Sequence, residues 1–302
     1  MLALWIPITI AAAFFQNLRS VLQKAIKGRL STTGAAYARF VYAWPFAILY
    51  AWILHDGVGY DLPPVNNLFL LYCALGGAAQ ILFTVVLLWM FSFRSFAVGT
   101  TFSKLEVLLI AVLGAALLGD TVGPLAVVAI LIGSVGIIIL SFTETKLSIG
   151  GLMRGLTEKA TGVGLLAATL LGASVVFFRG AALALDGPDF LMAAAYTLAI
   201  SLIMQTLMMG AWFVIFDRPQ LMAVIREWRH ALPVGIVGMI TSACWFSAFA
   251  LQNAAYVRAL GQVELLFPFA ASAFIFREKV ARSEVIGVAL IVTAITLILL
   301  ES

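Results

Sequence analysis

The chain has 302 residues, of which 63% are hydrophobic and 11% are charged, and its mean hydropathy is +1.10. A soluble domain carries about 25% charged residues, so this composition excludes a soluble globular protein and predicts an all-α integral membrane protein. The net charge of +4 does not indicate a nucleic-acid partner, because most basic residues lie in short connectors between apolar runs.

Ten apolar runs are long enough to cross a bilayer as helices, since a spanning helix needs about 20 mostly apolar residues. The first run lacks the basic start and the small-residue cleavage site of a signal peptide, so we interpret it as a spanning helix. Both cysteines fall inside runs, which argues against a disulfide framework. The predicted helices cover residues 3–24, 34–54, 68–91, 97–118, 122–141, 161–184, 190–215, 232–253, 257–276 and 283–300.

Two stretches of the chain repeat each other. Residues 103–120 and 261–278 are apolar runs with one carboxylate near the middle and another at the end. Glu106 and Glu264 are 158 positions apart, and so are Asp120 and Glu278. The sequence therefore predicts an internal duplication with a buried glutamate in each copy.

The duplication divides the ten predicted helices into five plus five. We predict a first repeat over residues 1–142, a central cytoplasmic linker over 143–160 and a second repeat over 161–302. An odd number of helices in each copy places the two copies in opposite orientations, which is the inverted-repeat plan of secondary transporters.

The basic residues predict the orientation in the membrane. Thirteen of the 18 Lys and Arg lie in or beside alternate connectors, and the connectors on the other face are acidic, with Arg258 at one boundary. Basic connectors stay in the cytoplasm, so both termini are predicted to lie outside. The thirteen are Lys24, Lys27, Arg29, Arg94, Lys146, Arg154, Lys159, Arg218, Arg226, Arg229, Arg277, Lys279 and Arg282.

Glu106 and Glu264 are the strongest candidates for a functional site. They are the two acidic residues that fall deep inside predicted helices. A charge in the membrane interior costs a few kcal/mol, so such residues usually face a cavity and have a functional role. We expect them to bind a cationic group of a substrate, a coupling proton, or each in turn. The alternative is a structural ion pair, in which a glutamate is neutralised by Arg39, Lys104 or Arg19.

Other polar and aromatic residues inside the runs complete the candidate substrate site, because polar groups in lipid must point toward partners inside the protein. A stripe of small residues beside each glutamate indicates either room for a ligand or close helix packing. Pro268 removes the hydrogen-bond donor for the carbonyl of Glu264, which indicates either a ligand-binding carbonyl or a kink. The additional candidates are Asn17, Arg39, Gln80, Trp89, Ser103, Trp245 and Gln262.

No catalytic or metal-binding pattern accompanies these residues. The two histidines lie in connectors, and the chain has no metal-spaced Cys/His set and no phosphate-binding glycine loop. We therefore expect no enzyme activity, no cofactor and no metal. A lipid or lipid-precursor flippase is the main alternative function, and an ion channel or a membrane enzyme is disfavoured.

The order of helices and motifs resembles the EamA branch of the drug/metabolite transporter superfamily. Leu-Gly-Asp at 118–120 and Phe-Arg-Glu at 276–278 resemble its run-ending Gly-Glu, and Phe267-Pro268 and Gly287 match a proline and a glycine of its ninth and tenth helices. Ile110 stands where the family has a proline in the first copy. The resemblance implies a ten-helix carrier with a cavity lined by helices that include the fourth and the ninth.

Together these observations predict a secondary transporter in the inner membrane of a bacterium. It would move a small polar organic solute, namely an amine, an amino acid or another zwitterion, by alternating access, with or without proton coupling. The expected partners are this small-molecule substrate and the lipid bilayer, and the sequence leaves a homodimer open.

Overall fold

The computed structural model describes residues 4–26, 28–90, 93, 96–145, 158–187, 189–275 and 281–301, and all regular structure in these ranges is helical. The described chain divides into two compact units, which we treat separately. Unit 1 comprises Met1–Ile81 and Phe177–Gln252, and unit 2 comprises Leu82–Val176 and Asn253–Ser302. Each unit therefore contains chain from both predicted repeats. The extent of the repeats stays a prediction, and most of the predicted linker lies outside the described residues.

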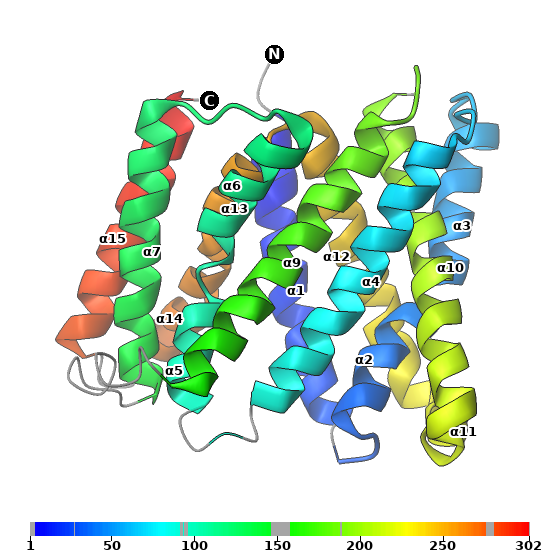
Figure 1. The fold of residues 1–302 in the computed structure, drawn as a ribbon, viewed down its shortest axis with the longest axis horizontal. Helices are drawn as coiled ribbons and strands as arrows, with labels where there is room; N and C mark the ends of the chain where they lie inside the picture. The colour runs from blue at the N-terminus through cyan, green and yellow to red at the C-terminus, as the bar shows by residue number, and fades with distance from the viewer. Residues whose placement is uncertain are drawn as a thin grey trace. The chain divides into compact units, whose positions relative to one another are not determined.

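Unit 1 is a helical bundle in which α12 contacts α1, α2, α3 and α10 (Figure 1). Part of α4 and part of α9 also belong to unit 1, because both helices run through the two units. The helices of unit 1 are α1 (Trp5–Ile26), α2 (Thr32–Val41), α3 (Trp44–Trp52), η1 (Ile53–Gly57), α4 (Asn67–Met90), α9 (Lys159–Leu183), α10 (Phe190–Phe216), α11 (Arg218–Arg226) and α12 (Trp228–Leu251).

Small residues allow the helices of unit 1 to approach one another closely. A Cβ placed on Gly235 of α12 would lie 2.6 Å from the backbone carbonyl carbon of Tyr42, so α12 can pack here only without a side chain. Helices in lipid gain little from hydrophobic burial and associate mainly through such close packing. Around this contact, Tyr37 and Phe213 pack with ring centroids 5.2 Å apart, and both side chains are buried.

Unit 2 contains the predicted fourth and ninth spans, residues 97–118 and 257–276, in full. The most extensive helix–helix contact of unit 2 is between α7 and α15, which lie side by side (Figure 1). A Cβ placed on Gly136 of α7 would lie 2.9 Å from the carbonyl oxygen of Gly287 of α15, so these two backbones touch. Its helices are α5 (Phe96–Ser103), α6 (Glu106–Leu118), α7 (Pro124–Thr145), α13 (Ala254–Gly261), η2 (Gln262–Leu265), α14 (Leu266–Ala270), η3 (Ala271–Ile275) and α15 (Arg282–Glu301).

Two helices that the sequence predicts as continuous are broken. The predicted span 97–118 consists of α5 and α6, separated by Lys104 and Leu105. The predicted span 257–276 consists of α13, the 3₁₀ segment η2, the short α14 and the π-helical η3. The hydropathy pattern misses these breaks, because the few polar residues at them, Lys104, Gln262 and Glu264, do not interrupt the long apolar runs in which they lie.

The helices recur at the separation that the sequence repeat predicts. Helices α2 and α10 begin at Thr32 and Phe190, which are 158 positions apart. The same separation relates the starts of α5 and α13, the starts of α7 and α15, and the ends of α5 and α13. Even the N-caps of α2 and α10, Ser31 and Asp189, correspond, and each side chain accepts a hydrogen bond from a backbone N–H of its helix.

The described residues contain seven helices that are long and apolar enough to span a membrane by length and composition. An all-helical membrane protein is therefore confirmed, whereas the ten-helix inverted repeat stays a prediction. Three predicted spans are not among the seven: α1, the α5–α6 passage and the α13–η3 passage. The seven cover Thr32–Gly57, Asn67–Leu87, Pro124–Ser141, Lys159–Leu183, Phe190–Phe216, Trp228–Leu251 and Arg282–Glu301.

Candidate functional site

A polar pocket lies inside unit 1. Its empty volume is about 320 Å³, part of which is open to the surroundings. Helices α1, α2, α4, α10 and α12 all contribute to its wall. The lining residues are Arg19, Arg39, Phe40, Gln80, Leu198, Leu202, Gln205, Gly238, Ser242 and Phe246.

Two arginines give the pocket its charge. Arg19 comes from α1 and Arg39 from the last turn of α2, and Gly238 of α12 leaves room for both. A Cβ on Gly238 would lie 3.6 Å from Cδ of Arg19 and 3.8 Å from Cβ of Arg39. The guanidinium of Arg39 lies 4.6 Å from the ring centroid of Phe40, a cation–π contact that orients it. Because no acidic residue is among the lining residues, the pocket is suited to an anionic group.

A hydrogen-bonded pair of glutamines also lines the pocket. Nε2 of Gln205 donates a hydrogen bond to Oε1 of Gln80 at 2.7 Å, which joins α10 to α4. Gln205 is 2% exposed, so its amide is held in a fixed orientation by the residues packed around it and by the hydrogen bond to Gln80. The pocket therefore combines two cations, an oriented amide pair and the Ser242 hydroxyl with the apolar side chains of the wall.

The other predicted site residues of unit 1 are not pocket-lining residues. Asn17 donates to the carbonyl of Ala13 within α1 at 3.1 Å. Trp245 donates from Nε1 to Oε1 of Gln16 at 2.9 Å and so ties α12 to α1. Their role in substrate binding stays a prediction. In the structure, both side chains make hydrogen bonds within or between helices.

Unit 2 brings the two predicted glutamates into one charged cluster, which we call the Glu–Arg–Glu triad: Glu106, Arg258 and Glu264. Arg258 forms an ion pair with Glu106 through Nη2 and Oε1, and the two side chains are 12% and 11% exposed. Glu264 is close enough to Arg258 for a direct electrostatic interaction. The partner of Glu106 in the described structure is thus Arg258, and not Arg39, Lys104 or Arg19 as the sequence suggested.

The two helix breaks position the ion pair. Glu106 is the first residue of α6, and Arg258 lies in the last turn of α13. An anion is stabilised at a helix N-terminus and a cation at a C-terminus, so each side chain sits at the favourable end of its helix. Asn253 holds the start of α13: its Oδ1 accepts from the N–H of Ala255 at 2.9 Å, and its Nδ2 donates to the carbonyl of Thr121 at 3.2 Å.

The remaining predicted site residues of unit 2 have different surroundings. Ser103 is buried and donates to the carbonyl of Thr100 at 2.8 Å, inside α5. Trp89 is 54% exposed and contacts Phe93, with ring centroids 5.4 Å apart. Gln262 is 5% exposed, and neither polar atom of its side chain makes a hydrogen bond within the described structure. The small residues of the stripe serve close packing at Gly99, where an added Cβ would lie 2.6 Å from the carbonyl oxygen of Ala160.

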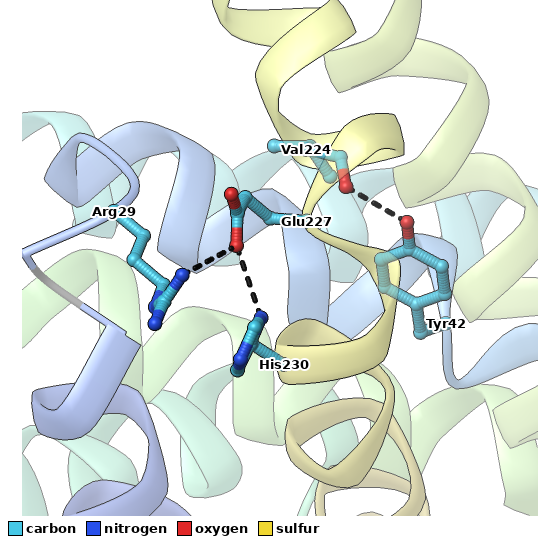
Figure 2. A network of polar contacts seen from close by, with 5 residues as sticks. All are labelled: Arg29, Tyr42, Val224, Glu227 and His230. Atoms are coloured by element: carbon cyan, nitrogen blue, oxygen red, sulfur yellow. Dashed lines mark hydrogen bonds and ion pairs between the residues drawn. The ribbon is translucent and has the colours of Figure 1, made fainter.

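A third polar cluster fastens one end of unit 1. Figure 2 shows the carboxylate of Glu227 between Arg29 and His230, at 3.4 Å and 3.0 Å, while Tyr42 donates to the carbonyl of Val224 at 2.8 Å. About half of the Arg29 and His230 side chains is exposed, and exposed ion pairs contribute only about 0–1 kcal/mol. This network joins the connector after α1 to the start of α12, and sequence reasoning did not anticipate it.

The sequence analysis also missed the roles of Arg258 and Arg179. Arg258 was placed at a helix boundary, although it stands six positions before Glu264 within the predicted span. Arg179 donates to the carbonyls of Phe249 and Gln252 and so satisfies the end of α12. Within the described ranges, no three His, Cys, Asp or Glu residues gather in a way that could hold a metal ion.

Comparison with known proteins agrees with this picture. Residues 159–300 match the EamA-like transporter family. No curated protein sequence matches the chain. Twenty-four chains of known structure resemble it, and one of them, described only as the crystal structure of a protein, does so with a TM-score of 0.70 at 17% identity. That likeness covers 98% of this chain and 96% of the other, so it extends to nearly the whole fold.

Proposed function

We propose that this chain, a multi-pass membrane protein whose residues 159–300 form an EamA-like transporter domain, is a secondary carrier for a small zwitterionic solute such as an amino acid. The transporter domain excludes an enzyme and implies a small-molecule substrate. In the proposed mechanism, the substrate carboxylate binds to Arg39 and Arg19, and the carrier alternates between outward-open and inward-open states.

The observation that carries this proposal is the charge of the unit 1 pocket. Two arginines line it, and its other lining residues are neutral. A guanidinium offers parallel N–H donors that match the geometry of a carboxylate, so a carboxylate fits better here than a lone ammonium group. A purely cationic amine would meet like charge at the same place, which makes an amino acid or another zwitterion the better substrate.

The neutral residues of the pocket offer the other contacts that a zwitterionic solute would make. The Gln80–Gln205 pair and Ser242 supply donors and acceptors, and Phe40, Phe246, Leu198 and Leu202 supply an apolar wall. Ligand pockets are usually lined by apolar side chains with a few placed polar groups. The apolar wall would receive the side chain of an amino acid, while the arginines and amides would receive its polar end.

The recurrence of helices supports the alternating-access mechanism. The separation of 158 residues between corresponding helix starts, and the equivalent ends of α5 and α13, are what two copies of one unit would produce. In carriers built from inverted repeats, broken helices lie near the binding sites, and one part rocks against the other. We place the carrier in a bacterial inner membrane with both termini outside, as the distribution of basic connectors favours.

A thermal-shift screen of the purified protein tests the substrate class. A ligand that binds the native state raises the apparent melting temperature. We expect amino acids to do so, whereas the same molecules with the carboxylate removed, or converted to a methyl ester, should not. The proposal is wrong if the amines stabilise the protein as well as the amino acids do.

The contribution of Arg39 is tested in the same screen. The variant Arg39→Gln should lose most of the shift produced by amino acids, because the amide cannot replace a charged, forked donor. Arg226→Gln is the matched control, since Arg226 is exposed on α11 and does not line the pocket. Equal loss in both variants would assign the effect to general surface charge and would contradict the pocket.

A further inference from the structure

We propose that the surface formed by α11 and the start of α12 binds the headgroups of anionic phospholipids, with its arginines on the phosphate groups and its apolar side chains against the acyl chains. We call this surface the α11 face, and all of it belongs to unit 1. Its residues are Arg218, Met222, Ile225, Arg226 and Arg229. The proposal concerns the lipid around the protein, so it stands or falls independently of the transported solute.

The connectivity of the chain places α11 at a membrane boundary. This helix links α10 to α12, and both of these are long and apolar enough to span a bilayer. Figure 1 shows α11 at the end of α10. With nine residues, α11 is only about 14 Å long, whereas the hydrocarbon core of a bilayer is about 30 Å thick. Helix α11 therefore does not span the membrane itself, and it lies where two spans end and lipid headgroups begin.

One side of α11 is exposed and carries both apolar and basic residues. Arg218, Met222, Ile225 and Arg226 follow one another at steps of four, three and one, so they share a helical face. Met222 is 58% exposed and Ile225 is 52% exposed, and both arginines are exposed too. The other side packs against α2 and α10 and buries Val224 completely. An outward face of apolar and basic side chains is typical of a helix that lies in the plane of the membrane surface.

The residues on either side of α11 mark the same level of the membrane. Trp228 begins α12 and is 49% exposed, and the guanidinium of Arg229 lies 5.5 Å from its ring centroid. Phe216 ends α10 and is 71% exposed. Nε of Arg218 donates to the carbonyl of Val214 at 2.7 Å, which fixes this guanidinium at the end of α10. Tryptophan is enriched at the membrane–water interface, so the arginines stand at the depth of the headgroups.

The positive charge of the α11 face is not compensated within the protein. Its three arginines form no ion pair with any residue in the part of the chain that the structure describes. The two neighbouring acidic residues are engaged elsewhere: Asp217 accepts a hydrogen bond from the N–H of Gln220 at 3.2 Å, and Glu227 lies between Arg29 and His230. A guanidinium matches the geometry of a phosphate group, so an anionic phospholipid complements both the charge and the apolar part of this face.

Lipid titrations of the purified full-length protein in an uncharged detergent test the proposal. Dioleoylphosphatidylglycerol and dioleoylphosphatidylcholine have the same acyl chains and differ in net charge, and each is added while the apparent melting temperature is followed. A ligand of the native state raises this temperature. Because arginines near the membrane surface attract anionic lipid, we expect phosphatidylglycerol to act at an about tenfold lower concentration than phosphatidylcholine. Equal effects of the two lipids would overturn the proposal.

The double variant Arg226→Gln/Arg229→Gln assigns this preference to the α11 face. Both side chains are exposed, so in detergent without added lipid the variant should melt with the wild type. With lipid it should lose most of the preference for phosphatidylglycerol. The matched control is Lys159→Gln/Arg282→Gln, which removes two exposed cations from unit 2. An equal loss in the control would assign the preference to the overall charge of the protein and would contradict the proposal.

Two further measurements distinguish a lipid from a free anion. Met222→Gln/Ile225→Gln keeps the arginines and removes the apolar side chains, so it should weaken the stabilisation by both lipids. A full response of this variant would contradict the contact with acyl chains. Inorganic phosphate at the concentration of the lipid should leave the melting temperature of the wild type unchanged. A shift with phosphate as large as the shift with phosphatidylglycerol would assign the arginines to a soluble anion and would overturn the proposal.

Discussion

Arg258 at the end of α13 forms a buried ion pair with Glu106 at the start of α6, and the two helices are thereby joined where each passage is broken. The pair explains how a carboxylate is tolerated deep in an apolar run, because its charge is compensated at close range. Each break exposes a helix end whose partial charge matches the neighbouring side chain.

Breaking the pair from one side is expected to destabilise unit 2 strongly. In Arg258→Met the carboxylate of Glu106 remains buried without its guanidinium, and removal of one partner of a buried pair costs about 3–5 kcal/mol. We predict a clear fall in the apparent melting temperature of the purified protein. The double variant Glu106→Gln/Arg258→Met should recover most of that loss, because no buried charge is left behind.

The matched control for this prediction is Arg226→Met, which removes an exposed arginine from α11. Surface substitutions usually change stability by less than about 0.5 kcal/mol, so the control should melt with the wild type. A double variant less stable than Arg258→Met would show that the pair is not the source of the effect.

Two glycines of α9 provide a second test of the packing in unit 2. A Cβ on Gly164 would collide with the backbone of Gly99 in α5, whereas a Cβ on Gly162 would meet nothing within 4 Å. We predict that Gly164→Ala loses about 1–3 kcal/mol of stability through overpacking. Gly162→Ala should be neutral or slightly stabilising, because alanine favours a helix over glycine by up to about 1 kcal/mol. Thermal unfolding of the two variants under the same conditions tests this prediction.

Much of the fold follows from the sequence for a simple reason. Every backbone polar group in a bilayer must be hydrogen-bonded within the protein, so long apolar runs become helices. The same argument brought Arg39 and Gln80 into the candidate site, because both are polar residues inside apolar runs and both line the pocket. The sequence repeat also predicted where helices recur, as the equivalent starts of α2 and α10 illustrate.

What the sequence did not reveal depends on which faces of the helices meet. A hydropathy pattern indicates which residues lie within the membrane, but not which neighbouring helix a side chain faces. The sequence analysis therefore placed Arg258 at a helix boundary and did not identify it as the partner of Glu106. The breaks at Leu105 and Gln262 were missed because a change in backbone hydrogen bonding leaves no mark on composition. Gln205 and Arg19 are polar residues inside predicted helices, yet only their positions on separate helices show that they share a pocket with Arg39.

The orientation in the membrane is open to direct labelling. Thirteen basic residues on one set of connectors predict that both termini lie outside. In a variant whose buried Cys73 and half-buried Cys244 are replaced by alanine, a cysteine at Asp61 should react with an impermeant maleimide in intact cells. A cysteine at Arg226 should react only after the cells are permeabilised, and the reverse pattern would invert the topology.

The last prediction separates folding from recognition in the unit 1 pocket. In Gln205→Met the side-chain oxygen of Gln80 loses the donor that lies at 2.7 Å, and the loss of such a hydrogen bond costs about 0.5–1.5 kcal/mol. Replacement of both partners by apolar groups of similar shape can be nearly neutral, so Gln80→Met/Gln205→Met should be more stable than the single variant. If the amide pair also orients the substrate, this stable double variant should lose the thermal shift with amino acids. A double variant that keeps the full shift would show that the arginines recognise the substrate without the glutamines.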